Sequence, residues 1–197
     1  AVLIMGTLII IGLIGGGTYY YLNYIAGTKG DVLDNISESI AVHTGTLLDV
    51  REALDKDLPQ DYIKSIGILK QYIKPGETAP SSIGLDGQVK FNLIVSYDKR
   101  VEQVAVTDKN ITDALSGSPD NLDLIKAKAL SHYIQRQYDQ AAMLLQSHAG
   151  SDDPEIFYIL GLAAFGKNDF KNAETFYNTG FVKSNGKSAK ITYALAD

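Results

Sequence analysis

Residues 153–177 read DPEIFYILGLAAFGKNDFKNAETFY and decide the fold of this 197-residue chain. Asp153 is suited to cap a helix, and Pro154 to take its first position, where the missing N–H costs nothing. A polar turn at 166–168 ends this helix before a second one returns. Apolar side chains recur three and four positions apart on one face of each helix. The stretch therefore predicts a helical hairpin packed through Phe157, Leu160, Gly161, Ala164, Phe170, Ala173, Phe176 and Tyr177.

A second, similar hairpin is predicted immediately before the first. The segment YDQA at 138–141 aligns with FKNA at 170–173, an offset of about 32 residues. The upstream unit carries Ala129 and Ala141 at the positions of Gly161 and Ala173, where small side chains let two helices approach closely. A repeated helix-turn-helix unit of this length indicates an array whose neighbouring units bury each other's apolar faces.

These two units resemble tetratricopeptide repeats over about residues 120–184. The second unit matches the family's large, small and aromatic positions well, whereas Lys128 and His132 depart from the pattern in the first. The resemblance implies an interaction surface for protein partners and no catalytic chemistry. Because fewer than three repeats rarely bury a continuous core, we expect the preceding part of the chain to cover them.

The first 26 residues carry no charge, and Lys29 is the first charged side chain. A run of this length can cross a bilayer as a helix, with the tyrosines at 19–24 at one interface. The sequence thus predicts a single-pass transmembrane helix over 1–27, in contact with lipid, with the body outside the cytoplasm. Gly12 and Gly16 form a G-x-x-x-G spacing through which two such helices could pair, a route to self-association.

Residues 28–76 predict two amphipathic helices. The first has apolar residues alternately three and four apart, and His43 lies in the same seam. This seam either pairs with another chain or packs on its own domain, and the sequence leaves both open. The second helix begins near Pro59 and stops before Pro75. The seam consists of Leu33, Ile36, Ile40, Leu47, Val50 and Leu54.

Residues 77–118 predict a loop followed by a β-hairpin. The loop covers 77–87, which is rich in Pro, Ser and Gly, and the strands cover Val89–Tyr97 and 101–106, which alternate in β-branched and polar residues. The expected fold class is therefore α+β and mostly helical. Its parts are the membrane helix (1–27), the amphipathic region (28–76), the loop and β-hairpin (77–118), and the helical repeats with a tail (119–197).

The composition of the chain argues against several classes of function. The net charge is −5, which argues against nucleic acid as a partner, and the absence of Cys removes thiolate chemistry and Cys-type metal sites. Isolated histidines, and the lack of a phosphate-binding loop or a carboxylate paired with a base, argue against an enzyme. We expect no cofactor, no metal and no small-molecule substrate.

Two functions fit this organisation. The first is a membrane-anchored scaffold or adaptor of a cell-envelope complex that binds proteins through its helical repeats. The second is a subunit of an extracellular filament, because an apolar helix leading into an amphipathic one is similar to the layout of type IV pilins. Leu3 and Ile4 fit the pilin helix, but Met5 stands where that family has Glu, and a helical-repeat C-terminus is atypical.

Overall fold

The computed structural model describes residues 7–12, 19–24, 47–73, 79–98 and 104–196. The chain divides into two compact units, Ala1–Leu48 and Asp49–Asp197. In the first unit, β1 (Thr7–Gly12) and β2 (Tyr19–Tyr24) pair antiparallel, with Thr7 opposite Tyr24 and Gly12 opposite Tyr19.

The described parts of the N-terminal segment therefore differ from the predicted helix over 1–27. Runs of isoleucine and of tyrosine suit an extended backbone as well as an apolar helix. Gly12 ends β1, and Gly16 lies outside the described residues. In the part of the chain that the structure describes, no helix is both long enough and apolar enough to cross a bilayer. The membrane anchor and the helix pairing stay predictions.

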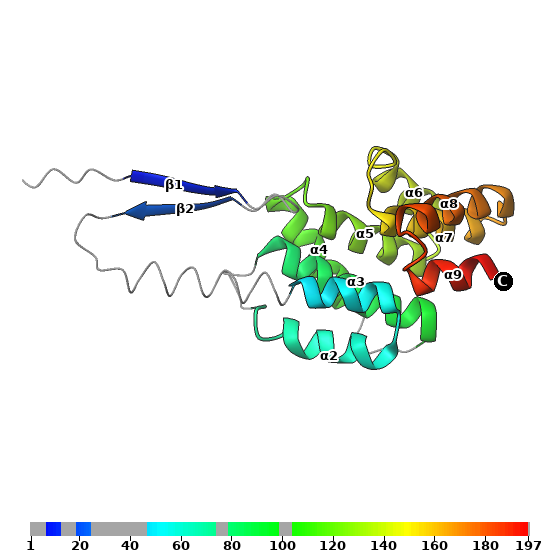
Figure 1. Ribbon diagram of the computed structural model, residues 1–197, viewed down its shortest axis with the longest axis horizontal. Coiled ribbons are helices and arrows are strands. Elements are labelled where there is room, and N and C mark those ends of the chain that lie inside the picture. Colours follow the sequence, from blue (N-terminus) through cyan, green and yellow to red (C-terminus); the bar gives the residue numbers. More distant parts are fainter. Residues whose placement is uncertain (1–6, 13–18, 25–46, 74–78, 99–103, 197) are drawn as a thin grey trace, which may run out of the picture. The chain divides into compact units, whose positions relative to one another are not determined.

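The described residues of the second unit contain helices and no strand. A helix over 47–56 is followed by α2 (Pro59–Leu69), α3 (Pro80–Tyr97) and α4 (Val104–Gly117). The chain continues through α5 (Leu122–Ile134), α6 (Tyr138–Gln146), α7 (Pro154–Gly166) and α8 (Phe170–Lys183), and ends in α9 (Ala189–Ala196) beside the C-terminus (Figure 1). The four helices predicted between 120 and 184 are confirmed.

Consecutive helices pair as hairpins, α3 with α4, α5 with α6 and α7 with α8, and α9 packs on α8. Between the last two hairpins the 32-residue offset holds in detail: Asn121 and Asp153 cap α5 and α7, and the turns have left-handed residues at Arg136 and Asn168. Ring pairs bridge the same two turns, Tyr133 with Tyr138 and Phe165 with Phe170. The body is an array of helical hairpins that is similar to tetratricopeptide repeats (TPR-like).

The predicted β-hairpin is wrong, since Val89–Tyr97 lies in α3 and residues 104–106 begin α4. The predicted loop also ends earlier, at Pro80, which takes the first position of α3. Helix α3 is buried nearly all round, so its apolar residues do not follow one stripe and their alternation imitates a strand. Its small residues serve close packing: a Cβ on Gly84 would lie 2.4 Å from the backbone carbon of Asp123 in α5. The α+β class is corrected to an all-helical body.

The repeat-packing residues predicted from sequence lie in the core, except Phe170 and Phe176, of which Phe176 is partly buried against the core. Gly161 contacts the ring of Tyr177 across the α7–α8 hairpin, where an added Cβ would come within 2.2 Å of the ring. Phe170 is 57% exposed and packs on Phe165 instead. The buried members are Ala129, Ala141, Phe157, Leu160, Gly161, Ala164, Ala173 and Tyr177.

Only part of the amphipathic seam can be placed. Val50 and Leu54 are buried in the helix over 47–56, and Leu47 is partly buried. Both Val50 and Leu54 face the same unit of this chain, which supports intramolecular packing for this end of the seam. Leu33, Ile36, Ile40 and His43 lie outside the described residues, so pairing with another chain through them stays open.

Candidate binding groove and the polar network beside it

A cavity of about 520 Å³ opens on the face formed by the first helices of the hairpins. Its walls come from the end of α3, the end of α5, most of α7, and α9, with one side chain from α8 and one from the turn after residue 56. Six of its lining side chains are aromatic: Tyr97, Tyr133, Tyr158, Phe165, Tyr177 and Tyr193. We call this cavity the aromatic groove.

The rings of the groove differ in their access to solvent. Tyr158 and Tyr177 form its floor, each 4% exposed, with ring centroids 6.2 Å apart. Burial raises the pKa of both hydroxyls, so they stay protonated at any physiological pH. Tyr193 and Phe165 stand at the rim, 66% and 49% exposed. Exposed rings above a buried aromatic floor leave apolar contact area open to an incoming chain.

Two charged side chains line the groove. The ammonium of Lys190 lies 4.9 Å from the centre of the Tyr158 ring and forms an ion pair with Glu155. Asp57, which is 4% exposed, accepts hydrogen bonds from the hydroxyls of Tyr62 at 2.5 Å and of Ser96 at 3.2 Å. The Tyr97 hydroxyl donates to the backbone carbonyl of Asp57 and so fixes the turn against α3.

The turn at Asp57 is held by its local structure. Asp57 follows the helix over 47–56 in the left-handed region, with φ of 50°, which a short polar side chain tolerates better than most. Its carboxylate accepts a hydrogen bond from the hydroxyl of Tyr62 in α2. Burial, followed by the negative charge of Asp57, raises the pKa of Tyr62, which keeps this hydroxyl a donor. The groove wall is thus built into the hairpin of the helix over 47–56 and α2.

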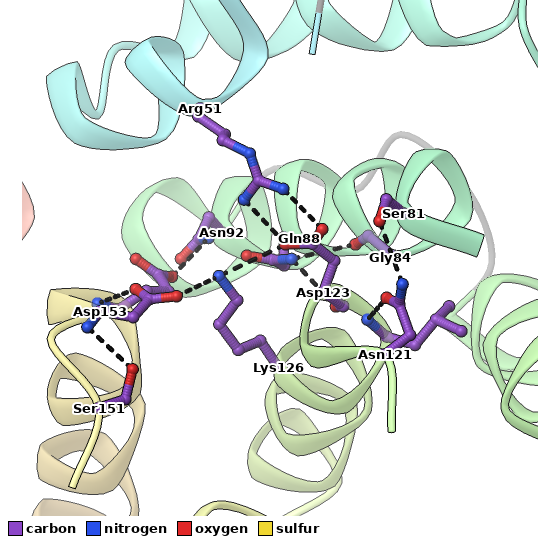
Figure 2. A network of polar contacts seen from close by, with 12 residues as sticks. Arg51, Ser81, Gly84, Gln88, Asn92, Asn121, Asp123, Lys126, Ser151 and Asp153 are labelled. Atoms are coloured by element: carbon purple, nitrogen blue, oxygen red, sulfur yellow. Dashed lines mark hydrogen bonds and ion pairs between the residues drawn. The ribbon is translucent and has the colours of Figure 1, made fainter. Parts of the chain in front are cut away.

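A network of buried charges lies along the starts of α5 and α7. Arg51 reaches across from the helix over 47–56 and donates to both oxygens of Asp123 (Figure 2). Lys126 lies 2.7 Å from Asp153 and 3.5 Å from Asp123, so it bridges the two carboxylates. Asn92 of α3 donates to Glu155 at 3.4 Å.

Within this network, contacts with opposite charges compensate the energetic cost of burying ionised side chains. Burial would raise the pKa of Asp123, but Lys126 and Arg51 together lower it below its ordinary value. Burial would likewise lower the pKa of Lys126, and the charges of Asp153 and Asp123 raise it instead. These residues are ionised because each has an opposite charge in contact. The arrangement links four helices: the helix over 47–56, α3, α5 and α7.

Three further observations bear on chemistry. In the ranges that the structure describes, no three His, Asp or Glu side chains are grouped to hold a metal ion. The ring nitrogen Nδ1 of His132 forms a hydrogen bond with the amide oxygen of Gln137. Asp153, read from sequence as a helix cap, does accept from the backbone N–H of Glu155 at 3.0 Å.

The groove is not predicted by the sequence pattern. Its rings come from five helices, and for Tyr177 the pattern predicts a role in packing. The sequence does carry one signal for such a site, which is its twelve tyrosines. Several of them lie next to an apolar stripe of a helix, outside the stripe itself. Tyr158, next to Phe157, is one of these.

The fold and the groove together define a TPR-like helical array with an aromatic groove on its first-helix face. No protein-family model matches the sequence, and no curated protein matches it either. Two solved structures are similar: a mutant of MamA, at 16% identity and a TM-score of 0.46, covering 83% of this chain and 86% of that one, and MamA MSR-1, at 16% identity and 0.42, covering 75% and 84%. Likenesses at this level do not carry a function from one chain to another.

Proposed function

We propose that the chain is a non-enzymatic scaffold whose aromatic groove binds a segment of a partner protein. The observation that carries this is the groove itself, in which rings from several hairpins converge and two of them, Phe165 and Tyr193, remain exposed at the rim. Large rigid rings give contact area at a low cost in side-chain entropy, and for this reason they are enriched in protein interfaces.

The N-terminal segment adds a location to this proposal. The 28 uncharged residues before the first charge, Lys29, fit a single membrane anchor, with the groove-bearing body outside the cytoplasm in a cell-envelope complex. The filament alternative rests on the order of elements in the sequence, and the described residues add no observation in its favour.

Site-specific photo-crosslinking in the cells that produce the protein tests the groove. A benzoylphenylalanine would replace Tyr193 or Phe165 at the rim, and Met143 or Val182 as controls, which are 71% and 72% exposed on the second helices α6 and α8. We expect one partner protein to be crosslinked from the rim positions and not from the controls. Equal crosslinking from all four positions, or none from the rim, would contradict the proposal.

The anchor is tested separately on the same cells. Extraction of the membrane fraction at high pH should leave the full chain in the pellet, and replacing Ile9, Ile10 and Ile11 by Lys should release it. Release of the unaltered chain at high pH would contradict a membrane-spanning anchor and leave the groove proposal standing.

A further inference from the structure

The charges around the aromatic groove do not balance. Asp57 accepts hydrogen bonds from two neutral hydroxyls, and among the described residues no cation forms an ion pair with it. Lys190, the cation on the groove wall, is already paired with Glu155. Within the described ranges, the groove therefore has a buried carboxylate, that of Asp57, whose charge is not compensated by an ion pair.

The rings of the groove are suited to receive a cation. The faces of Tyr and Phe rings carry partial negative charge and attract ammonium and guanidinium groups. The structure already contains one such contact, because the Lys190 ammonium lies over the ring of Tyr158. Tyr97 and Tyr193, which are 39% and 66% exposed, also line the groove.

We propose that the aromatic groove recognises a basic partner segment, and that an arginine or lysine side chain of this segment lies against Tyr97 and Tyr193 with Asp57 as its counter-charge. This rests on the proposed binding function and specifies the chemistry of its partner. A guanidinium suits the site best because it stacks on rings and donates several hydrogen bonds to one carboxylate.

Binding of labelled model peptides to the purified full chain, in nonionic detergent and low salt, tests the inference. The probes are an acetylated and amidated tetra-arginine, its tetra-citrulline counterpart, which has the same shape without charge, and tetra-glutamate. We expect tetra-arginine to bind about tenfold or more tightly than tetra-citrulline, which corresponds to about 1.4 kcal/mol. Tetra-glutamate should not bind.

Two variants distinguish the groove from the general acidity of the chain. Asp57→Asn keeps the shape and tolerates the left-handed backbone, and we expect it to remove most of the preference for arginine over citrulline. Glu174→Gln, the matched control, removes one negative charge from an exposed position of α8 and should leave that preference unchanged. Tyr193→Leu keeps apolar volume at an exposed position and should reduce arginine binding alone. Circular dichroism would establish that each variant is folded.

The outcomes separate this inference from the proposed function. Equal binding of arginine and citrulline probes, or an equal loss in Asp57→Asn and Glu174→Gln, would overturn the basic preference even where the rim still crosslinks one partner. Binding of tetra-glutamate would overturn it as well. A rim that crosslinks nothing in cells would instead refute the proposed function, whatever the peptides do.

Discussion

Arg51 and Asp123 lie 72 positions apart and form a two-pronged ion pair, with nitrogen–oxygen distances of 2.9 and 2.7 Å. The carboxylate is buried, and the arginine side chain as a whole is 35% exposed. This pair joins the helix over 47–56 to α5, which contains Asp123. It therefore attaches the groove wall that carries Asp57 to the body that carries the aromatic rings.

Replacing Arg51 by Met should destabilise the fold. The substitution keeps most of the apolar stem but leaves a buried carboxylate with Lys126 alone, and breaking a buried pair costs about 3 kcal/mol. Urea unfolding followed by circular dichroism would measure the change. Lys56→Met is the control, because the Lys56–Glu52 pair is exposed and its loss should not be measurable. Equal effects of the two substitutions would show that the buried pair contributes nothing.

The loss of stability at low pH should depend on Asp123. Burial opposes ionisation, but Lys126 and Arg51 lower the folded-state pKa of Asp123 below its unfolded value. The stabilisation is then fully present above the unfolded pKa of about 3.9 and is lost as the pH falls through the folded pKa. Unfolding free energy measured between pH 2 and 6 should fall less steeply in Asp123→Asn. An unchanged slope in that variant would assign acid sensitivity to other carboxylates.

The sequence predicts the α5–α8 part of this fold well and the α3–α4 part badly, for a physical reason. Asp153 and Pro154 start a helix by local chemistry, and the small residue at Gly161 marks a close approach within one hairpin. In α3, by contrast, Gln88 and Asn92 are polar yet buried, and they bond to the backbone of Asp123 and to Glu155 on other helices. Local pattern does not reveal hydrogen-bond partners on other helices, and the alternation in this segment therefore predicts a strand in place of the helix.

The groove could not be predicted from the sequence for the same reason. Tyr97, Tyr158 and Tyr193 belong to three helices, and nothing in their spacing along the chain indicates that they line one cavity. The repeat does indicate that first helices share a face, but not that α9 continues this face after α7. What brings Tyr193 into the groove is the ion pair of Lys190 with Glu155 and the burial of Ile191.

Gly161→Ala should destabilise the α7–α8 hairpin by about 2 kcal/mol, since the added Cβ would lie 2.2 Å from the Tyr177 ring and the core has no room for it. Gly67→Ala is the control: nothing lies within 4 Å of its Cβ position in α2, so alanine should stabilise by up to about 1 kcal/mol. Thermal unfolding would compare the two.

The repeat itself supplies the rescue for this variant. Ala129 and Leu145 occupy the positions 32 residues before Gly161 and Tyr177. Combining Gly161→Ala with Tyr177→Leu copies that pairing into the second unit, and it should recover most of the lost stability through coupling of the two sites. A double variant no more stable than Gly161→Ala would mean that the two hairpins pack differently in spite of their common offset.

Arg136→Asn should stabilise the chain. Arg136 has φ of 62° at the end of α5, and Asn168 occupies the same turn position after α7 with φ of 61°. In both turns the residue that follows donates its N–H to a carbonyl five residues back, at 2.8 Å from Gln137 to His132 and 2.9 Å from Asp169 to Ala164. A left-handed backbone costs a long side chain about 1 kcal/mol, and Asn tolerates it better. The variant should therefore melt a few degrees higher, whereas Gln135→Asn, one position earlier with φ of −82°, should not. A melting temperature lowered by Arg136→Asn would show that the arginine side chain contributes more than its backbone strain costs.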